Sequence, residues 1–407
     1  MKGLEGSLKQ LISSKSEEIS HYLISVRRTL HKNPELSFKE AKTSAFIIQE
    51  LENHGIKIFQ RMAGTGLVVL IKGKNPEKQC LLLRGDMDAL PIQELNTVEY
   101  KSVNPGAMHA CGHDVHSTCV LGAAIILNQM RDCFEGTIKI IFQPGEELLP
   151  GGASMMIKEG VLEDPGVDKA LALHVFPDLE SGQAGFRSGK YMASTDEIYL
   201  VVRGKGGHAA MKEEYINPLL IASELLLALE KEFTGNIPAD DSGDKIPTVL
   251  AFGKIEGMGA TNIIPENVKI EGTFRTFNEK WRKEAHKKIQ LISEEIAARH
   301  KGSAEVKILA GYPFLINDTA VTEIAKEVAY GFLGKGNVFD LPLRMTAEDF
   351  SFITQKIPSC FFRLGTGNKS LGITHGVHTP YFDIDERAIS IGAGLLAAIS
   401  IALLSDG

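Results

Sequence analysis

The sequence predicts an α/β protein of two domains, in which a small ferredoxin-like domain is inserted into a larger α/β/α domain. Three observations support this prediction. Short, almost purely apolar runs alternate with helical stretches in the first third of the chain, as in sheets covered on both faces. The middle of the chain has the order strand, helix, strand, strand, helix, strand, which is the split βαβ arrangement. The first pattern then resumes, and 407 residues are enough for two domains.

The first part of the chain is expected to begin with two helices. Ser16-Glu17-Glu18 precedes apolar residues spaced as on one helix face, which predicts a helix with Ser16 as its capping residue. Ser37-Phe38-Lys39-Glu40 has the form of a capping box and predicts a second helix that ends near Asn53-His54-Gly55. Buried strands and a further helix follow: Gly66–Ile71, Cys80–Leu83, Ile138–Phe142 and Ala170–Val175, with the helix over Ser117–Met130.

The inserted domain is predicted from six consecutive elements. Its strands are expected at Ile198–Val202, Val249–Ile255, Val268–Thr276 and Ala304–Leu309, and its helices at Pro218–Phe233 and Lys280–Arg299. We therefore expect the small domain at residues 193–311 and the larger domain at residues 1–192 and 312–407.

Composition excludes several classes of partner. The 44 Lys+Arg and 51 Asp+Glu give a net charge of −7, and no basic run is interleaved with aromatic residues, so no nucleic-acid partner is expected. Five scattered cysteines do not form a disulfide framework, and residues 1–20 lack the apolar core of a secretory signal. We expect a cytoplasmic protein. The uncharged stretch Ala388–Leu404 contains several Ser and Gly and lacks basic or aromatic flanks, so we expect a core helix and no membrane contact.

Acids and a histidine follow the buried runs of the predicted sheet. Asp86 and Asp88 come after one run, Glu146 and Glu147 after another, and His174 follows Leu171-Ala172-Leu173. Ligands of open α/β sheets bind beyond the carboxyl ends of the strands. We therefore expect these side chains at one edge of the sheet.

Two further segments add metal-binding side chains. Residues 108–116 contribute a thiol and three imidazoles, and residues 375–378 contribute two more imidazoles. Thiolate, imidazole and carboxylate together suit zinc, manganese or cobalt, and the thiolate favours zinc. Five ligands are too many for one ion and would suit two divalent ions with a shared bridge: Cys111, His113, Glu147, His174 and His378.

The sequence leaves several roles open in this cluster. A neutral imidazole has one free lone pair, so either Cys111 or Glu147 is the protein bridge. The side chains of adjacent glutamates point in different directions, so one can bind metal while its neighbour acts as a base. His109 and His116 are either orienting partners of the ligands or surface histidines.

These residues belong to a series of motifs that resembles the aminoacylase and carboxypeptidase family of co-catalytic metallopeptidases, in its amidohydrolase branch. That branch includes hippurate hydrolase, N-acyl-L-amino-acid amidohydrolase and indoleacetyl-amino-acid hydrolases. The motifs are RRTLHKNPELSFKE at 27–40, RGDMDALP at 84–91, MHACGHDVH at 108–116, FQPGEE at 142–147, ALHV at 172–175, MAST at 192–195, GKGGHAA at 204–210, NIIPE at 262–266, GTFRT at 272–276, AEDF at 347–350 and HTPYF at 378–382.

The resemblance implies roles for individual residues. It assigns metal binding to the same five side chains and the role of general base to Glu146. It also ranks His375 below His378 as a ligand. Other branches have a metal-binding His where this chain has Asp86, so we expect Asp86 and Asp88 to orient ligands rather than bind metal, with Asp88 part of the catalytic apparatus.

The inserted domain resembles the family's lid domain, which commonly pairs with its copy in a dimer. The resemblance implies that His208 steadies the developing oxyanion, from its own or the partner subunit, and that Asn262 and Arg275 lie near the substrate's carboxylate or oxyanion. Where many relatives continue with Met-Pro-His, this chain has Met211-Lys212-Glu213, which affects substrate preference more than catalysis.

The sequence thus predicts metal-dependent hydrolysis of the amide bond of N-acyl-L-amino acids by a homodimer or higher oligomer with two divalent ions per subunit. A dipeptidase or aminopeptidase could use the same apparatus. A catalytically inactive binding protein is a further alternative, which the presence of Glu146 and His208 argues against. A thiol redox role for Cys111 lacks a C-x-x-C partner.

Overall fold

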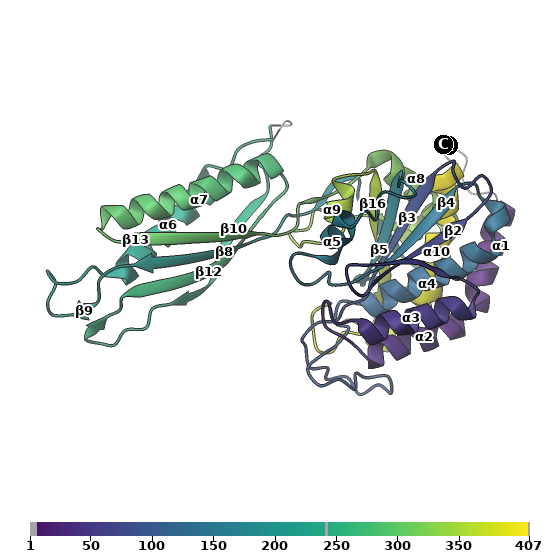
Figure 1. Cartoon of the computed structure of the whole chain (residues 1–407), viewed down its shortest axis with the longest axis horizontal. Coiled ribbons are helices and arrows are strands. Elements are labelled where there is room, and N and C mark those ends of the chain that lie inside the picture. The colour runs from purple at the N-terminus through teal and green to yellow at the C-terminus, as the bar shows by residue number, and fades with distance from the viewer. Residues whose placement is uncertain (1–5, 241–242, 406–407) are drawn as a thin grey trace. The chain divides into compact units, whose positions relative to one another are not determined.

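The computed structural model describes residues 6–240 and 243–405, and the chain divides into two compact units (Figure 1). The first unit comprises Met1–Tyr191, Ile316–Pro342 and Asp349–Gly407. The second comprises Met192–Leu315 and Leu343–Glu348. Each unit has its own hydrophobic core, so the two can be described separately.

The first unit is built on an eight-stranded mixed sheet with the strand order β1-β2-β4-β3-β5-β16-β6-β15. Its centre, β4-β3-β5-β16, is parallel, and β2 joins β4 in antiparallel pairing. The predicted buried runs are strands β2 to β5. The strands are β1 Ile58–Met62, β2 Gly66–Lys72, β3 Cys80–Asp86, β4 Thr137–Gln143, β5 Lys169–Glu180, β6 Ala184–Phe186, β15 Val338–Asp340 and β16 Ser359–Gly367.

Helices cover both faces of this sheet. Most of them, including α4 and α10, lie on one face, whereas the short helices α5 and α9 contact β4 and β16 from the other (Figure 1). Every residue of β3 and β4 is buried, which explains why both strands are largely apolar. The helices are α1 Gly6–Glu18, α2 Ser20–Lys32, α3 Ala41–Asn53, α4 His113–Gln129, α5 Gly152–Lys158, α8 Thr319–Leu333, α9 Ser351–Thr354 and α10 Arg387–Ser405.

The starts of the two N-terminal helices differ from the sequence prediction. Ser16 is a buried residue inside α1 and caps nothing, because a first helix already runs over Gly6–Glu18. Ser37 and Glu40 do not form a capping box, and α3 begins at Ala41 without a side-chain cap. The predicted end near Asn53 is correct.

The apolar C-terminal stretch is the central helix α10, as the sequence predicted. It packs against α4 and α8, and its buried residues belong to the main core of the first unit. Among the described residues, α10 is the one helix long and apolar enough to cross a membrane, and 83% of its most apolar stretch is buried inside the protein.

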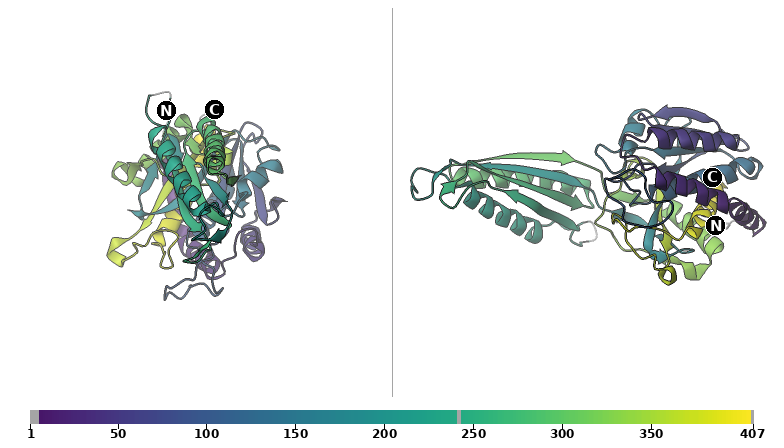
Figure 2. Two further views of the ribbon diagram at one scale, coloured as in Figure 1. Left: turned by 90° about the vertical axis from the view of Figure 1, so that its left-hand side faces the viewer. Right: turned by 90° about the horizontal axis from the view of Figure 1, so that it is seen from below.

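The second unit has the predicted ferredoxin-like order. Its four strands pair antiparallel in the order β10-β12-β8-β13, and α6 and α7 contact each other beside them, as the two views of Figure 2 also show. The elements are β8 Asp196–Arg203, α6 Pro218–Gly235, β10 Thr248–Glu256, β12 Asn267–Thr276, α7 Glu279–Arg299 and β13 Ser303–Ala310.

Four short strands complete the description. In the second unit β9 (Gly207–His208) pairs with β11 (Ile263–Ile264), a pairing that the sequence did not predict. The strands β7 (Gly189–Met192) and β14 (Leu315–Asn317) lie where the chain passes from one unit to the other.

Candidate metal and catalytic centre

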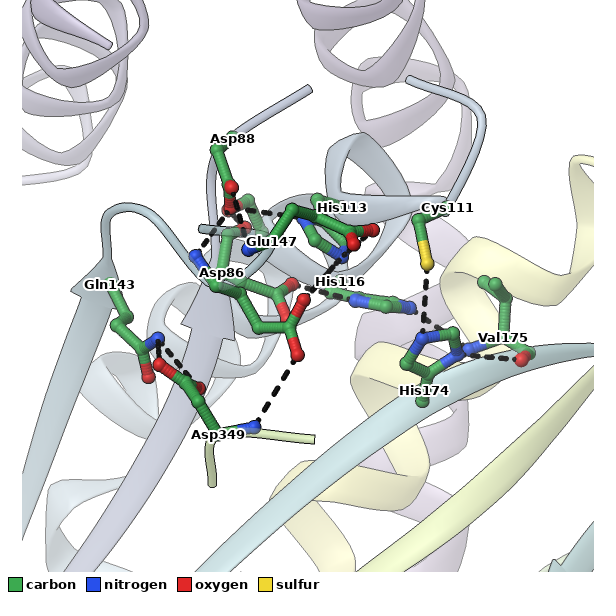
Figure 3. A network of polar contacts seen from close by, with 12 residues as sticks. Asp86, Asp88, Cys111, His113, His116, Gln143, Glu147, His174, Val175 and Asp349 are labelled. Atoms are coloured by element: carbon green, nitrogen blue, oxygen red, sulfur yellow. Dashed lines mark hydrogen bonds and ion pairs between the residues drawn. The ribbon is translucent and has the colours of Figure 1, made fainter. Parts of the chain in front are cut away.

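The candidate centre lies at the carboxyl ends of the parallel strands β4, β3 and β5. Asp86 ends β3, and the Glu146-Glu147 pair follows β4 after a Pro-Gly turn. The strand β5 continues to Glu180, beyond the predicted end. Its pairing with β3 stops at Ala172, so His174 lies two residues beyond the part of β5 that pairs with β3. Figure 3 shows the side chains from these strands facing those at the start of α4.

The five predicted ligands all belong to the first unit, and their donor atoms lie close together. The Sγ of Cys111 lies 3.4 Å from Nε2 of His174 and 3.3 Å from Nε2 of His378. The Oε1 of Glu147 lies 3.2 Å from Nε2 of His378 and 3.9 Å from Nε2 of His113. Four separate segments of the chain therefore deliver nitrogen, sulfur and oxygen donors to one place.

The backbone around Cys111 holds these donors in position. Gly112 has φ 80°, and a Cβ there would lie 2.6 Å from Cγ2 of Val175, so a glycine is required between the two ligands. His378 has φ 62°, which is unusual for a residue with a side chain, and its amide donates to the carbonyl of Ala110. Nδ1 of His174 donates to the carbonyl of Val175, so its Nε2 faces Cys111.

Asp88 connects the start of α4 to the glutamate pair. Its carboxylate accepts hydrogen bonds from Nδ1 of His113 and from the amides of Glu146 and Glu147. Burial opposes ionisation of Asp88, but these bonds and one from Ser37 outweigh it, and the pKa of Asp88 lies below its usual range. Because Asp88 accepts the Nδ1 proton of His113, the Nε2 of this imidazole is left as the ligand atom.

Asp86 holds other side chains. It pairs with Arg84 and accepts a hydrogen bond from Nδ1 of His116 at 2.7 Å, while Nε2 of His116 accepts from the amide of Val175. Burial opposes the ionisation of Asp86, but Arg84 and the imidazoles of His113 and His116 outweigh this effect. The pKa of Asp86 therefore lies well below its usual range. His116 is thus a buried orienting partner and not a surface histidine.

The donor set fits divalent metal ions. Nε2 of His113 is buried without a hydrogen-bond partner, a costly arrangement unless a further group binds there. Among the described residues, five groups of three side chains bring their donor atoms within 4.8 Å of one another. Three of them consist of predicted ligands and Glu146: Cys111, His113 and His174; Cys111, Glu147 and His378; and His113, Glu146 and Glu147. The other two are Asp86 with His113 and His116, and Glu146 with Glu348 and Asp349. Cys111, His113 and Glu147 each belong to two of the first three groups. Because a neutral imidazole has one free lone pair, Cys111 and Glu147 remain the candidates for a bridge.

The electrostatics of the centre also favour cations. Burial and the carboxylates of Glu147 and Glu146 raise the pKa of the Cys111 thiol well above its usual value. A thiolate at this position therefore requires compensating positive charge. Burial would lower the pKa of His113, but the carboxylates of Asp86 and Asp88 outweigh it and raise that pKa to about 10.

Glu146 is the second carboxylate at the centre. Its side chain is buried, Oε2 lies 3.9 Å from Nε2 of His113, and Oε1 accepts a 3.4 Å hydrogen bond from the amide of Asp349. Asp349 in turn accepts hydrogen bonds from Gln143 (Figure 3). It also accepts one from Arg84. A buried network therefore holds Glu146 beside the ligand cluster.

The three remaining predicted residues belong to the second unit. His208 ends β9, is exposed, and its Nδ1 accepts a hydrogen bond from the amide of Ala210. Neutral His208 therefore carries its proton on Nε2. The carbonyl of Asn262 accepts from the amide of Ala209, which brings Asn262 beside His208. Arg275 lies next to the end of β12 and donates to the carbonyl of Met345, and burial lowers its pKa.

Two other histidines take different places. His109 is buried, and neither of its ring nitrogens has a hydrogen-bond partner. His375 is exposed and packs in a tilted arrangement against Tyr381, with ring centroids 5.3 Å apart, outside the ligand groups.

Sequence reasoning missed several supporting residues at the centre. Arg84, Gln143 and Asp349 lie inside recognised motifs, but buried polar side chains beside strand ends give no signal of their own in a single sequence. Ser37 gave a misleading signal, because its spacing to Glu40 matches a capping box.

Comparison with known proteins places the chain among hydrolases. The model of peptidase family M20/M25/M40 matches residues 82–401. The N-acetyl-L-cysteine deacetylase of Bacillus subtilis is 38% identical over 367 residues, which are 90% of this chain and 84% of that protein. IAA-amino acid hydrolase ILR1-like 4 of Arabidopsis thaliana is 36% identical over 403 residues, 98% of this chain and 89% of that protein.

A solved structure agrees with these sequence matches. The YXEP protein of Bacillus subtilis, described as a dinuclear metal binding peptidase from the M20 family, superposes with a TM-score of 0.81 at 32% identity, over 96% of this chain and 99% of that one. The family match over residues 82–401, together with relatives above 30% identity along almost the whole chain, shows that this protein is a hydrolase and belongs to peptidase family M20/M25/M40.

Proposed function

We propose that this chain hydrolyses the amide bond of N-acyl-L-amino acids to a carboxylate and an amino acid, using two divalent metal ions per subunit. The observation that carries the proposal is Glu146, a carboxylate held 3.9 Å from the unpartnered Nε2 of His113 and directly beside the ligand Glu147. Relatives named as an N-acetyl-L-cysteine deacetylase and an IAA-amino acid hydrolase support this substrate class.

The residues of the chain divide the chemistry between them. Divalent ions held by Cys111, His113, Glu147, His174 and His378 would acidify a water and polarise the scissile carbonyl. Zinc, manganese and cobalt all suit the donor set, and the thiolate favours zinc. Glu146 takes the proton of the attacking water and returns it to the departing amine, which is a poor leaving group unless protonated.

Other side chains support these steps. Asp88 fixes the imidazole of His113 and the amides of the glutamate pair, so the base keeps its place during proton transfer. The Nε2 proton of neutral His208 would stabilise the oxyanion, from the same subunit or its partner. Arg275 and Asn262 would hold the carboxylate of the amino-acid half. We further propose a cytoplasmic homodimer formed through the second unit, for which light scattering giving the mass of one chain would be contrary evidence.

A panel of substrates tests the proposal. Amine release from N-acetyl, N-benzoyl and indoleacetyl amino acids and from dipeptides is measured with metal-loaded protein. A Glu146→Gln variant should lose about 10²–10⁴-fold in kcat, while Glu77→Gln, an exposed glutamate of the same unit, should match the parent protein. Turnover by Glu146→Gln at the parental rate would exclude Glu146 as the base.

Peptide cleavage is the second candidate, because Thermostable carboxypeptidase 2 of Saccharolobus solfataricus is 35% identical over 97% of this chain. If the protein cleaves dipeptides and none of the N-acyl amino acids, peptide cleavage replaces the first proposal. Absence of all turnover with both metal sites filled would favour a binding protein.

A further inference from the structure

The N-terminal segment 37–40 contacts the candidate centre from outside the region that the family model matches. That match begins at residue 82. The motif at 27–40 is conspicuous in the sequence, yet the proposed mechanism uses none of it. Its residues bind the loops that carry the glutamate pair.

Ser37 reaches the centre through Asp88. Its hydroxyl donates a 2.6 Å hydrogen bond to Oδ2 of Asp88, the same oxygen that accepts from the amide of Glu147 at 3.0 Å. The other oxygen, Oδ1, accepts from the amide of Glu146 and from Nδ1 of His113. Ser37 therefore fixes the rotation of the one carboxylate that orients both glutamates.

Glu40 reaches the same loop by a second route. Its side chain is fully buried, and Oε1 accepts hydrogen bonds from the amides of Gly145 at 2.9 Å and Phe38 at 2.8 Å. Oε2 accepts from the hydroxyl of Thr65. Gly145 precedes Glu146, so this carboxylate anchors the turn from which Glu146 projects.

Packing closes the arrangement. A Cβ on Gly145 would lie 2.3 Å from Cε1 of Phe38, so the ring fills the space beside the turn. Phe38 has φ 63°, a conformation that a residue with a side chain adopts at some cost. The amide of Ala89, the residue after Asp88, also donates to the carbonyl of Glu35, which lies two residues before this segment.

We propose that segment 37–40 is a positioning element for the general base, in which Ser37 acts through Asp88 and Glu40 acts through Gly145. The proposal rests on the proposed function, in which Glu146 moves the proton. Ser37 and Glu40 are positioning residues, because their side chains hydrogen-bond to Asp88, Gly145, Phe38 and Thr65, none of which is a predicted metal ligand.

The first experiment compares Ser37→Ala with Thr29→Ala. Thr29 lies in the same N-terminal motif, is exposed, and its hydroxyl donates to the carbonyl of Ser25, away from the centre. We expect Ser37→Ala to lower kcat by about 10- to 100-fold, as loss of an orienting partner does, with KM and bound metal unchanged. Thr29→Ala should match the parent protein, and Ser37→Thr, which keeps the hydroxyl, should recover most of the kcat.

The second experiment tests the other route without removing the buried polar group. In Glu40→Gln the side-chain oxygen still accepts from Gly145 and Phe38, whereas Glu40→Ala removes both bonds. We expect Glu40→Gln to keep kcat within a few-fold of the parent and Glu40→Ala to lower it by at least about tenfold. Circular dichroism and bound-metal content establish that each variant is folded.

Several results would overturn the inference. A kcat of Ser37→Ala within about threefold of the parent would do so, as would a loss that excess metal restores, because metal affinity would then be the property that Ser37 controls. Failure of Ser37→Thr to recover activity would also count against it. If the parent protein cleaves none of the N-acyl amino acids, the proposed function fails instead, and the substrate that is cleaved replaces them in the same comparison.

Discussion

Asp88 is the residue on which the candidate centre depends most. Four donors meet on its two oxygens, from Ser37, His113 and the amides of Glu146 and Glu147. The start of α4, the glutamate loop and the N-terminal segment are thereby joined by one carboxylate. Its importance follows from this number of bonds and not from contact with substrate.

An amide at this position should fail even though it has the same shape. In Asp88→Asn one of the two oxygens becomes an NH₂ group, which donates and cannot accept. In one orientation this group would face the hydroxyl of Ser37 and the amide of Glu147, and in the other it would face the imidazole of His113 and the amide of Glu146. We expect kcat to fall by about 10- to 100-fold. Steady-state kinetics with metal analysis checks this, and Asp178→Asn, an exposed aspartate, is the control. Parental kcat in Asp88→Asn would show that a neutral acceptor is sufficient.

The clustering of the candidate ligands could be predicted from the sequence because their chemistry is specific. Thiol, imidazoles and carboxylates gathered so densely at strand ends have few roles besides metal binding, and the structure brings those of the first unit together. The polar side chains that support them could not be predicted in the same way. Ser37 and Glu40 have the spacing of a helix cap, and the sequence does not tell whether such side chains close on their own helix or on Asp88 and Gly145, far along the chain.

At the level of elements, α10 shows how closely the core of the first unit is packed. A Cβ on Gly392 would lie 2.7 Å from Sγ of Cys119 in α4 and 2.7 Å from Cδ2 of Leu364 in β16. The small residues that argued against a membrane span in the sequence therefore have a packing role. They let α10 approach α4 and the sheet that carries the centre.

The same substitution at two helical glycines separates packing from helix propensity. Gly331 lies in α8, and a Cβ added there would have nothing within 4 Å, so Gly331→Ala should raise the free energy of unfolding by up to about 1 kcal/mol. Gly392→Ala gains the same helix propensity, but the added methyl group must displace Cys119 and Leu364. We expect it to lower the free energy of unfolding by about 1–3 kcal/mol. Urea unfolding measures both, and equal effects would mean that α10 has room for a methyl group.

The second unit contains an acid-sensitive ion pair of its own. Asp196 at the start of β8 is buried and pairs with Arg282 and His286 of α7. Burial opposes its ionisation, but the hydrogen bonds from His286 and Arg282 outweigh it, and the pKa of Asp196 lies below its ordinary value of 3.8. A lowered folded-state pKa stabilises the fold above the unfolded value, and this stabilisation is lost as pH falls from 3.8 through the lower folded-state pKa.

Removing the carboxylate of Asp196 should therefore lower the free energy of unfolding at neutral pH. It should also make that free energy depend less on pH in the acid range. We expect Asp196→Asn to lose about 3 kcal/mol at pH 7, because the buried charge of Arg282 keeps only the less buried Glu279 as an ionic partner. Glu305→Gln breaks the exposed pair with Arg203 and should change stability by less than about 1 kcal/mol. Unfolding followed between pH 7 and pH 2 checks both. An acid dependence in Asp196→Asn as steep as in the parent protein would assign it to other groups.

Across the whole molecule, the two-unit organisation could be predicted because the order of helices and strands changes where the inserted unit begins. The sequence did not predict that Leu343–Glu348 also belongs to the second unit. The short pairing of β9 with β11 escaped prediction, since two-residue strands carry no periodicity. It is this pairing that brings His208 beside Asn262. The sequence thus identified both residues through the resemblance, but not the strand pair that places them together.

The two hydrophobic cores predict that metal stabilises one unit selectively. All five predicted ligands belong to the first unit, and the second has a core of its own. A ligand that binds the folded state at 100 times its Kd adds about 2.7 kcal/mol to the free energy of unfolding. Calorimetry should therefore show two transitions, of which zinc raises and chelator lowers only one. Asp196→Asn identifies the other, because it should lower the transition that zinc leaves unchanged. A single transition that moves with metal would instead mean that the second unit unfolds together with the metal centre, and that its residues contribute to the stability of that centre.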